Sequence, residues 1–209
     1  MNISRSYTSN TNQEEILKVT KSFRKDQAVY EQGDSAIRYY KVISGIVVIG
    51  SYTTEGKMVY KSLVHENEFF GDEVVSGLEQ RVNFALAFSK DLVIEEYKQD
   101  SFWINQFHQK EVLKSSLHRN LNTQHTMEVN SSMAVEDRVR HFLIGLADKK
   151  SIKLLTGELM VRMHVKHKEL AFACNSSRQC VSSIISKFQK EGGLRMDRTS
   201  FILSSDFEI

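Results

Sequence analysis

The chain contains no proline and only two cysteines among its 209 residues. Without proline, slow prolyl isomerisation cannot limit folding, although this absence carries no information about function. The cysteines, Cys174 and Cys180, are too few for a disulfide framework or for a four-ligand metal site. Residues 1–173 contain no cysteine at all, which excludes an iron–sulfur cluster in that part of the chain.

Long apolar runs are missing as well. No stretch approaches the roughly 20 apolar residues that a membrane-spanning helix requires. The first ten residues are polar and lack the apolar core of a secretion signal. The apolar fraction of 41% and the charged fraction of 26% are ordinary for a globular protein. We therefore expect a cytoplasmic protein without a membrane partner.

The net charge of +2 conceals an uneven distribution. Residues 1–137 hold 15 Lys and Arg against 19 Asp and Glu, which gives −4. Residues 138–209 hold 13 against 7, which gives +6. Only the basic C-terminal third is therefore expected to approach a polyanion such as nucleic acid.

The stretch 168–188 predicts two short helices joined by a tight turn. Each helix has one apolar face at helical spacing, formed by Leu170, Ala171 and Cys174 in the first and by Val181, Ile184, Ile185 and Phe188 in the second. Asn175 tolerates the left-handed conformation that such a turn needs, and Ser176 or Ser177 can cap the second helix. This pattern is typical of a DNA-reading helix-turn-helix. The alternative is an ordinary helical hairpin, and the polar outer face of helix 177–188 favours DNA.

The N-terminal half has a different pattern. After a predicted short helix at 14–20, alternating apolar residues and glycine turns predict strands at 28–30, 39–43, 46–52, 58–64, 84–88 and 92–97. Many short strands with such turns favour an antiparallel barrel or jelly roll. Between them, residues 68–75 are predicted to form a strand, a glycine turn and one helical turn, where a ligand could be enclosed.

Helical spacing returns after residue 97. A helix is expected over 102–134, its longer part from about Lys110, with a narrow apolar stripe that includes Val112, Leu113, Leu117 and Leu121. A narrow stripe is typical of a two-helix seam, and a helix packed on the barrel is the alternative. The remaining elements are a hinge near 134–137, a helix at 135–147, strands at about 152–155 and 158–165, and a wing-like hairpin at 194–203.

With its elements in this order, the chain resembles the Crp/Fnr superfamily of bacterial transcription regulators over residues 23–203. The motifs that carry the resemblance are Gly33-Asp34, Ile43-Ser-Gly45, Phe69-Phe-Gly71, Asp137-Arg138-Val139, and Glu169-Leu-Ala through Ser177-Arg178. The resemblance implies an α+β fold in three parts. These are an antiparallel β jelly-roll sensor domain at 1–108, a long dimerisation helix at 109–134 and a winged helix-turn-helix domain at 135–209.

The resemblance also implies a DNA-binding surface. Helix 177–188 would lie in the major groove of each half of a palindromic operator, where Arg178 matches guanine O6 and N7. At the two further reading positions, often Glu and Arg in the family, this chain has Gln179, which favours adenine, and Ser183. The other expected DNA contacts lie on the same helix, at the start of the preceding helix and on the wing, and they are Ser177, Ser182, Lys187, Lys166, Lys168, Arg195 and Arg198. The alternative for the lysines is a solvent-exposed face without DNA contacts.

A ligand site in the jelly roll is implied at positions that hold the ribose, phosphate and base of a cyclic nucleotide in some family members: Gly71, Asp72, Glu73, Arg81, Val82 and Thr123. Asp72 stands where those members have glutamate, and Val82 lacks the hydroxyl that would assist Arg81 in binding a phosphate. A cyclic nucleotide, another small effector and no ligand all remain open, and Arg81 could instead form a loop salt bridge.

The implied function is a homodimeric regulator that binds double-stranded DNA, acts with RNA polymerase and is not an enzyme. One alternative is a ligand-responsive jelly-roll module without DNA binding. A cupin-type enzyme is the other, but it needs clustered histidine and glutamate ligands, and the barrel contains only His65. No nucleophile elbow or phosphate loop is present, and no metal site is expected. His118 and His125 on the long helix suggest at most a weak pH or metal response.

Overall fold

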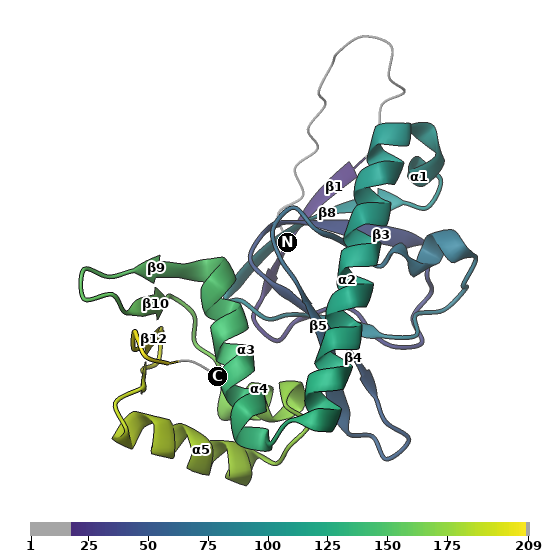
Figure 1. Cartoon of the computed structure of the whole chain (residues 1–209). Coiled ribbons are helices and arrows are strands. Elements are labelled where there is room, and N and C mark those ends of the chain that lie inside the picture. The colour runs from purple at the N-terminus through teal and green to yellow at the C-terminus, as the bar shows by residue number, and fades with distance from the viewer. Residues whose placement is uncertain (1–17, 208–209) are drawn as a thin grey trace. The chain divides into compact units, whose positions relative to one another are not determined.

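The N-terminal strands form two four-stranded antiparallel sheets in the computed structural model, which describes residues 18–207 (Figure 1). One sheet has the order β1-β8-β3-β6 and the other the order β2-β7-β4-β5. The strands are β1 (Lys18–Arg24), β2 (Ala28–Tyr30), β3 (Arg38–Ser44), β4 (Val47–Tyr52), β5 (Met58–Val64), β6 (Phe69–Phe70), β7 (Phe84–Ala87) and β8 (Asp91–Lys98). The predicted jelly roll is thereby confirmed, with β5 at the predicted bounds.

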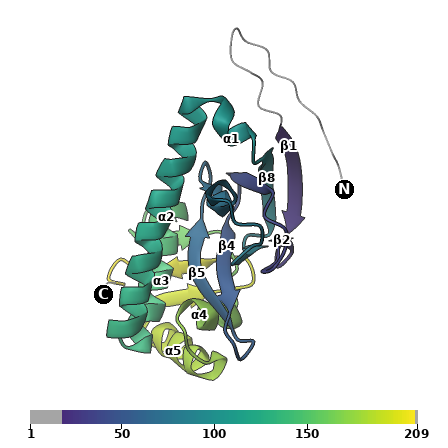
Figure 2. The same ribbon diagram turned by 90° about the vertical axis from the view of Figure 1, so that its right-hand side faces the viewer.

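The core of this jelly roll follows from the alternation of its strands. In β5, for example, Tyr60, Ser62 and Val64 are buried while the intervening residues are partly exposed. Figure 2 shows β4 and β5 side by side, as their antiparallel register requires. The apolar interior includes a stack of aromatic rings, in which Tyr40 and Phe70 have centroids 5.1 Å apart.

The sequence prediction is wrong at the first strand, β1. A short helix was expected at 14–20, but residues 18–20 belong to β1, and residues 14–17 lie outside the described part of the chain. The segment Lys18–Arg24 pairs over its whole length with β8, from Lys18 opposite Tyr97 to Arg24 opposite Asp91. Pairing with a strand more than 60 residues away along the chain therefore outweighs local helix propensity.

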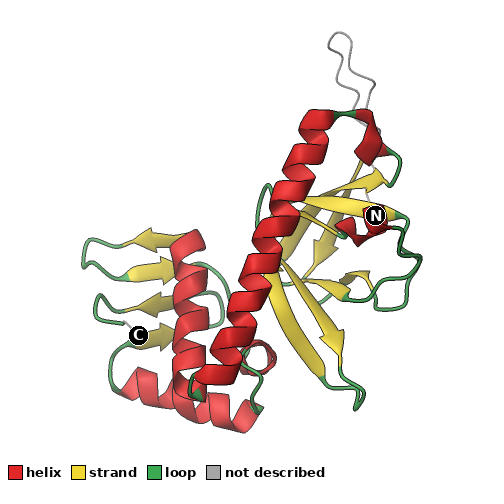
Figure 3. Cartoon of the chain, turned by 45° about the vertical axis from the view of Figure 1, so that its right-hand side comes forward, coloured by secondary structure: helices red, strands yellow, loops and turns green. Residues whose placement is uncertain are grey.

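A 27-residue helix, α2 (Gln106–Ser132), follows the short helix α1 (Ser101–Ile104), and its length is clear in Figure 3. Val112 on α2 is buried in a cluster with Phe102 and Val74, whereas Leu117 and Leu121 are exposed. The helical hydrogen bonds break at Ala134, whose backbone is extended, and α3 (Val135–Lys150) begins after it. The break between the two helices therefore lies at the position predicted for the hinge, near residues 134–137.

The described residues form two compact units, one up to His125 and the other from Thr126. The second unit contains α3, β9 (Ser151–Lys153), β10 (Leu159–Val161), α4 (His167–Ala173), α5 (Arg178–Lys190), β11 (Leu194–Met196) and β12 (Phe201–Leu203). Its strands form one sheet of order β11-β12-β10-β9 beside α3 (Figure 3). This is the predicted winged helix-turn-helix.

The predicted strand at 158–165 is too long by four residues at its C-terminal end. The strand ends at Val161, because the amide of Met163 turns back to donate to the carbonyl of Val161 (2.9 Å). None of the described helices combines the length and the apolar character that crossing a membrane requires.

Candidate nucleic-acid interface and effector site

The turn between α4 and α5 has the geometry that its sequence predicts. Asn175 adopts the left-handed conformation with φ 45°. Ser177 is the N-cap of α5, and its hydroxyl accepts a hydrogen bond from the Cys180 amide (3.1 Å). Ala171 is almost fully buried where the two helices pack together. These local interactions fix the direction in which α5 leaves the turn.

The residues predicted to contact DNA lie mainly on the exposed side of α5 or at its start. Ser177, Arg178, Gln179, Ser183 and Lys187 are exposed, while Val181, Ile185 and Phe188 face the core.

Ser182 differs from its neighbours because it is half-buried. Its hydroxyl is hydrogen-bonded to Nδ1 of His167 at the start of α4 (3.1 Å). Burial, together with the positive charge of Arg178, lowers the pKa of His167, so its imidazole is neutral at pH 7. Ser182 therefore links the two helices in the free protein.

Two further residues share the exposed face of α5 and were not among the predicted contacts. Ser186 and Lys190 are exposed and continue the spacing that Gln179 and Ser183 begin. Positions 179, 183, 186 and 190 follow a helical repeat of three or four residues, which is the signal that identifies them in the sequence. The structure extends the polar face by two residues, because α5 ends at Lys190 rather than at residue 188.

Two of the predicted phosphate-binding cations are already in ion pairs. Lys187 Nζ lies 2.7 and 2.8 Å from the carboxylate oxygens of Glu136 on α3. Arg195 on β11 forms a two-pronged pair with Glu158, with contacts of 2.8 and 3.0 Å. The predicted cations Lys166 and Lys168 are exposed at the start of α4.

The tip of the wing is held by the carboxylate of Asp197. It accepts hydrogen bonds from the amides of Thr199 (2.6 Å) and Ser200 (2.7 Å) and from both of their hydroxyls. The two backbone donors, followed by the hydroxyls, lower the pKa of Asp197 to about 2. Arg198 is exposed within this four-residue turn, where its side chain can reach an anion outside the protein.

In the jelly roll, Arg81 is buried with an exposure of 2%, and its guanidinium is hydrogen-bonded to other residues of the same unit. Its Nη1 donates to the carbonyl oxygen of Gly71 (2.8 Å) and to Oε1 of Glu73 (3.1 Å), and its Nη2 donates to the carbonyl oxygen of Arg38. Its guanidinium also lies 4.2 Å from the centre of the Tyr30 ring. The loop salt bridge that the sequence left open is therefore formed.

Asp72 has a partner that the sequence prediction missed. Its carboxylate pairs with the guanidinium of Arg119 on α2, which also donates to the carbonyl of Phe69 (2.5 Å). Thr123, one turn further on, donates its hydroxyl to the Arg119 carbonyl (2.9 Å). The position of Arg119 four residues before Thr123 places both on one helix face, and that spacing was the available signal. Val82 is 51% exposed.

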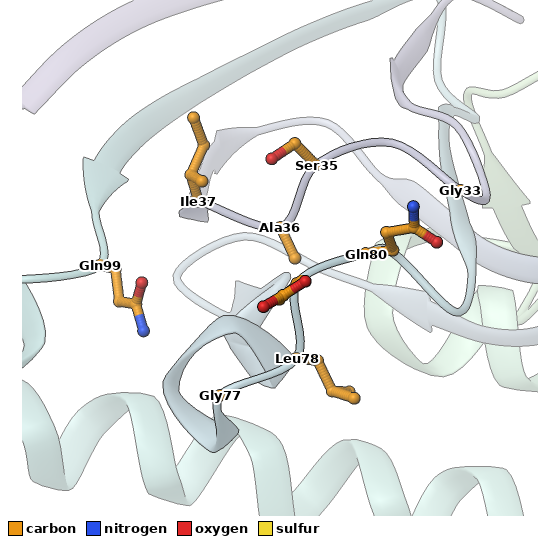
Figure 4. Close-up of a pocket in the computed structure, with 9 residues that line it drawn as sticks. Gly33, Ser35, Ala36, Ile37, Gly77, Leu78, Gln80 and Gln99 are labelled. Carbon is orange, nitrogen blue, oxygen red and sulfur yellow. The ribbon is translucent and has the colours of Figure 1, made fainter.

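A separate pocket of about 480 Å³ opens in the same unit (Figure 4). It lies between the segment 33–37, the turn at 77–80 and Gln99 after β8, and Ala36 and Gln99 point into it. The amide of Gln99 is engaged with the carbonyl of Val74 (2.9 Å). None of the six predicted ligand residues lines this pocket.

Neither cysteine belongs to a cluster with other potential metal ligands among residues 18–207, where no group of three such side chains is close enough to hold a metal ion. Burial raises the pKa of the Cys174 thiol to about 12, so it stays protonated in the core between the helices. Cys180 is exposed on the first turn of α5.

Comparison with known proteins agrees with this architecture. Residues 137–208 match the family model of the Crp-like helix-turn-helix domain. The transcriptional regulator SdrP of Thermus thermophilus is 26% identical over 163 residues, which cover 76% of this chain and 75% of SdrP. LdrP of the same organism, also a transcriptional regulator, is 22% identical over 174 residues, covering 82% and 85% of the two chains.

Solved structures show the same fold. A CRP-family transcriptional regulator from Thermus thermophilus superposes with a TM-score of 0.77 at 22% identity, covering 88% of this chain and 92% of that one. FixK2 from Bradyrhizobium japonicum gives a TM-score of 0.76 at 17% identity, covering 92% and 94%. The predicted resemblance and α+β fold are confirmed. Residues 137–208 form a Crp-like helix-turn-helix domain, and the chain as a whole is similar to transcriptional regulators of the CRP/FNR family.

Proposed function

We propose that two copies of this chain pair through α2 and bind a palindromic operator, one α5 helix to each half. The observation that carries the proposal is the outer stripe of α2, in which Leu113, Leu117, Leu121 and Met127 are 51%, 66%, 64% and 59% exposed. Large apolar side chains repeated at helical spacing on a helix are typical of a two-helix seam. A second copy of α2 has the complementary stripe, since a twofold interface uses the same surface twice.

The operator follows from this symmetry. Two recognition helices in successive major grooves on one side of the duplex lie about 34 Å apart, which is one helical turn. The target is therefore an inverted repeat whose half-sites are about one turn apart. Such a regulator acts on promoters, so we propose RNA polymerase as a further partner, the cytoplasm as its location and no catalytic role.

In vitro selection from a random-sequence duplex tests the proposal. We expect the wild-type protein to enrich an inverted repeat, and Arg178→Ala to lose the preference at one base position in each half. The loss of one two-pronged contact is expected to weaken operator binding by about 1–3 kcal/mol per contact. Arg162→Ala is the control, because Arg162 is an exposed arginine of the same unit that lies outside α5 and the wing. Enrichment of direct repeats, or unchanged base preferences in Arg178→Ala, would contradict the assignment.

We propose further that cyclic nucleotides do not gate this protein. The guanidinium of Arg81 is already hydrogen-bonded to Gly71, Glu73 and Arg38, and the carboxylate of Asp72 is already ion-paired with Arg119. A phosphate would have to displace these partners without help from a hydroxyl at residue 82. Buried charge pairs are costly to break, which makes such an exchange unfavourable.

Calorimetry of the full-length protein with cyclic AMP and with cyclic GMP is expected to show no saturable heat. DNA binding by the protein alone is expected to be unaffected by either nucleotide. A saturable binding isotherm at micromolar nucleotide, accompanied by a change in DNA affinity, would overturn this part of the proposal and leave the DNA-binding part intact.

A further inference from the structure

The ion pairs of Lys187 and Arg195 share one arrangement on the second unit. In each pair, the cation lies on or beside the predicted DNA-binding face and forms a salt bridge with a glutamate from a neighbouring element. Lys187 of α5 is held by both carboxylate oxygens of Glu136 at the start of α3, within 2.8 Å. Arg195 of β11 is held by both oxygens of Glu158, just before β10. All four side chains remain accessible to solvent, with 19% to 60% of each side chain exposed.

A carboxylate resembles a phosphate as a binding partner for a cation. Both offer two oxygens with a shared negative charge, and both accept the two-pronged donor of arginine. A cation that is paired with a carboxylate must give up that partner before it can contact DNA. The carboxylate then stands beside the incoming phosphate as a like charge, which is unfavourable.

The charge states of these groups support the pairing. The pKa of Lys187 is raised, chiefly by its hydrogen bond to Glu136. The pKa of Glu158 is lowered, chiefly by its hydrogen bond from Arg195 and then by the hydroxyl of Thr156. The negative charge of Glu191 also raises the pKa of Lys187, to a smaller extent than Glu136 does. The raised pKa keeps Lys187 protonated at neutral pH, and the lowered pKa keeps Glu158 ionised.

We propose that Glu136 and Glu158 are internal phosphate mimics, which occupy two cations of the DNA-binding surface in the free protein and are displaced by the DNA backbone. This inference rests on the proposed DNA-binding function, and it adds a mechanism that limits the affinity of the protein for DNA. Since backbone contacts carry no sequence information, the glutamates lower the affinity for every duplex by the same factor. The preference for the operator over other DNA is left unchanged.

The test measures binding of a fluorescent duplex by anisotropy at several salt concentrations. Two probes are used, namely a duplex selected in vitro by the wild-type protein and a random-sequence duplex of equal length. We expect Glu136→Gln to tighten binding of both probes by about threefold to tenfold, which follows from two exposed pairs per dimer at about twofold to threefold each. Asp148→Asn is the matched control, since Asp148 is an exposed carboxylate on the same helix. It removes one charge at a distance from Lys187 and is expected to change affinity by less than about twofold.

Two further variants make the test specific. Removing the cation with Lys187→Met is expected to remove most of the gain from Glu136→Gln, because only Arg140, whose Nη2 lies 3.8 Å from Oε1 of Glu136, then remains to be released. Glu158→Gln is expected to act as Glu136→Gln does, through Arg195. An equal effect of Glu136→Gln and Asp148→Asn would overturn the inference, as would a gain from Glu136→Gln that is undiminished beside Lys187→Met. A wild-type protein that binds neither duplex at low salt would instead overturn the proposed function itself.

Discussion

Placing two glutamates on the outer stripe of α2, in the variant Leu117→Glu/Leu121→Glu, is expected to convert the proposed dimer to a monomer and to weaken operator binding by about 1,000-fold. Specific dimeric regulators bind with dissociation constants of roughly 10⁻⁸ to 10⁻¹¹ M, whereas non-specific binding lies near 10⁻⁴ to 10⁻⁶ M. A monomer contacts only one half-site and loses most of this difference. Four glutamates facing one another across a seam repel, and each would be buried without a partner.

The two positions suit this test because they are 66% and 64% exposed in the single chain. Their replacement removes no core packing from the monomer, so the variant is expected to fold. Light scattering coupled to gel filtration measures the mass, and anisotropy measures the affinity. Leu155→Glu is the control, since Leu155 is a fully exposed leucine in the turn between β9 and β10. A double variant that remains dimeric would contradict the seam.

The second large effect is expected for Arg81→Ala, which should lower the free energy of unfolding by about 3 kcal/mol. Removal of one partner from a buried ion pair typically costs about 3–5 kcal/mol, and the partial exposure of Glu73 reduces this figure. The substitution leaves the carbonyl oxygens of Gly71 and Arg38 without their donor. It also removes the cation that lies over the ring of Tyr30.

Urea denaturation monitored by tyrosine and tryptophan fluorescence measures this change. Arg24→Ala is the control in the same unit, because Arg24 is exposed and its removal is expected to change the free energy of unfolding by less than about 0.5 kcal/mol. A second substitution, Glu73→Gln, is expected to recover part of the loss by removing the unpaired charge. Equal stabilities of the Arg81 and Arg24 variants would show that the buried arginine is not a structural element of the jelly roll.

The parts of the fold that the sequence predicts well are those set by nearby residues. Asn175 and Ser177 lie within four residues of the atoms that they position, so the turn and the cap of α5 were predictable. The face of α5 was predictable up to its end, but the prediction stopped at Phe188 and missed Lys190. Helix ends are the least reliable part of such a prediction.

What escaped prediction depends on residues that are distant in the chain. β1 is a strand because β8 pairs with it, and nothing within residues 18–24 specifies that partner. Arg119 joins Asp72 across 47 positions, and Lys187 joins Glu136 across 51. A periodic pattern gives the side of a helix on which a charge lies. It does not give the residue on another element that comes to face it.

The contacts of Arg119 have a consequence for the proposed dimer. Because this side chain is fixed to Asp72 and to the carbonyl of Phe69, α2 cannot rotate about its own axis without breaking both contacts. Leu117 and Leu121 lie two residues before and two residues after Arg119 on the same helix. The contacts that hold Arg119 to Phe69 and Asp72 of the jelly roll therefore also fix the direction in which these leucines point. The jelly roll therefore fixes the direction in which the apolar stripe of α2 faces. In the proposed dimer, a change at residue 72 is expected to alter the angle at which the two α2 helices pair.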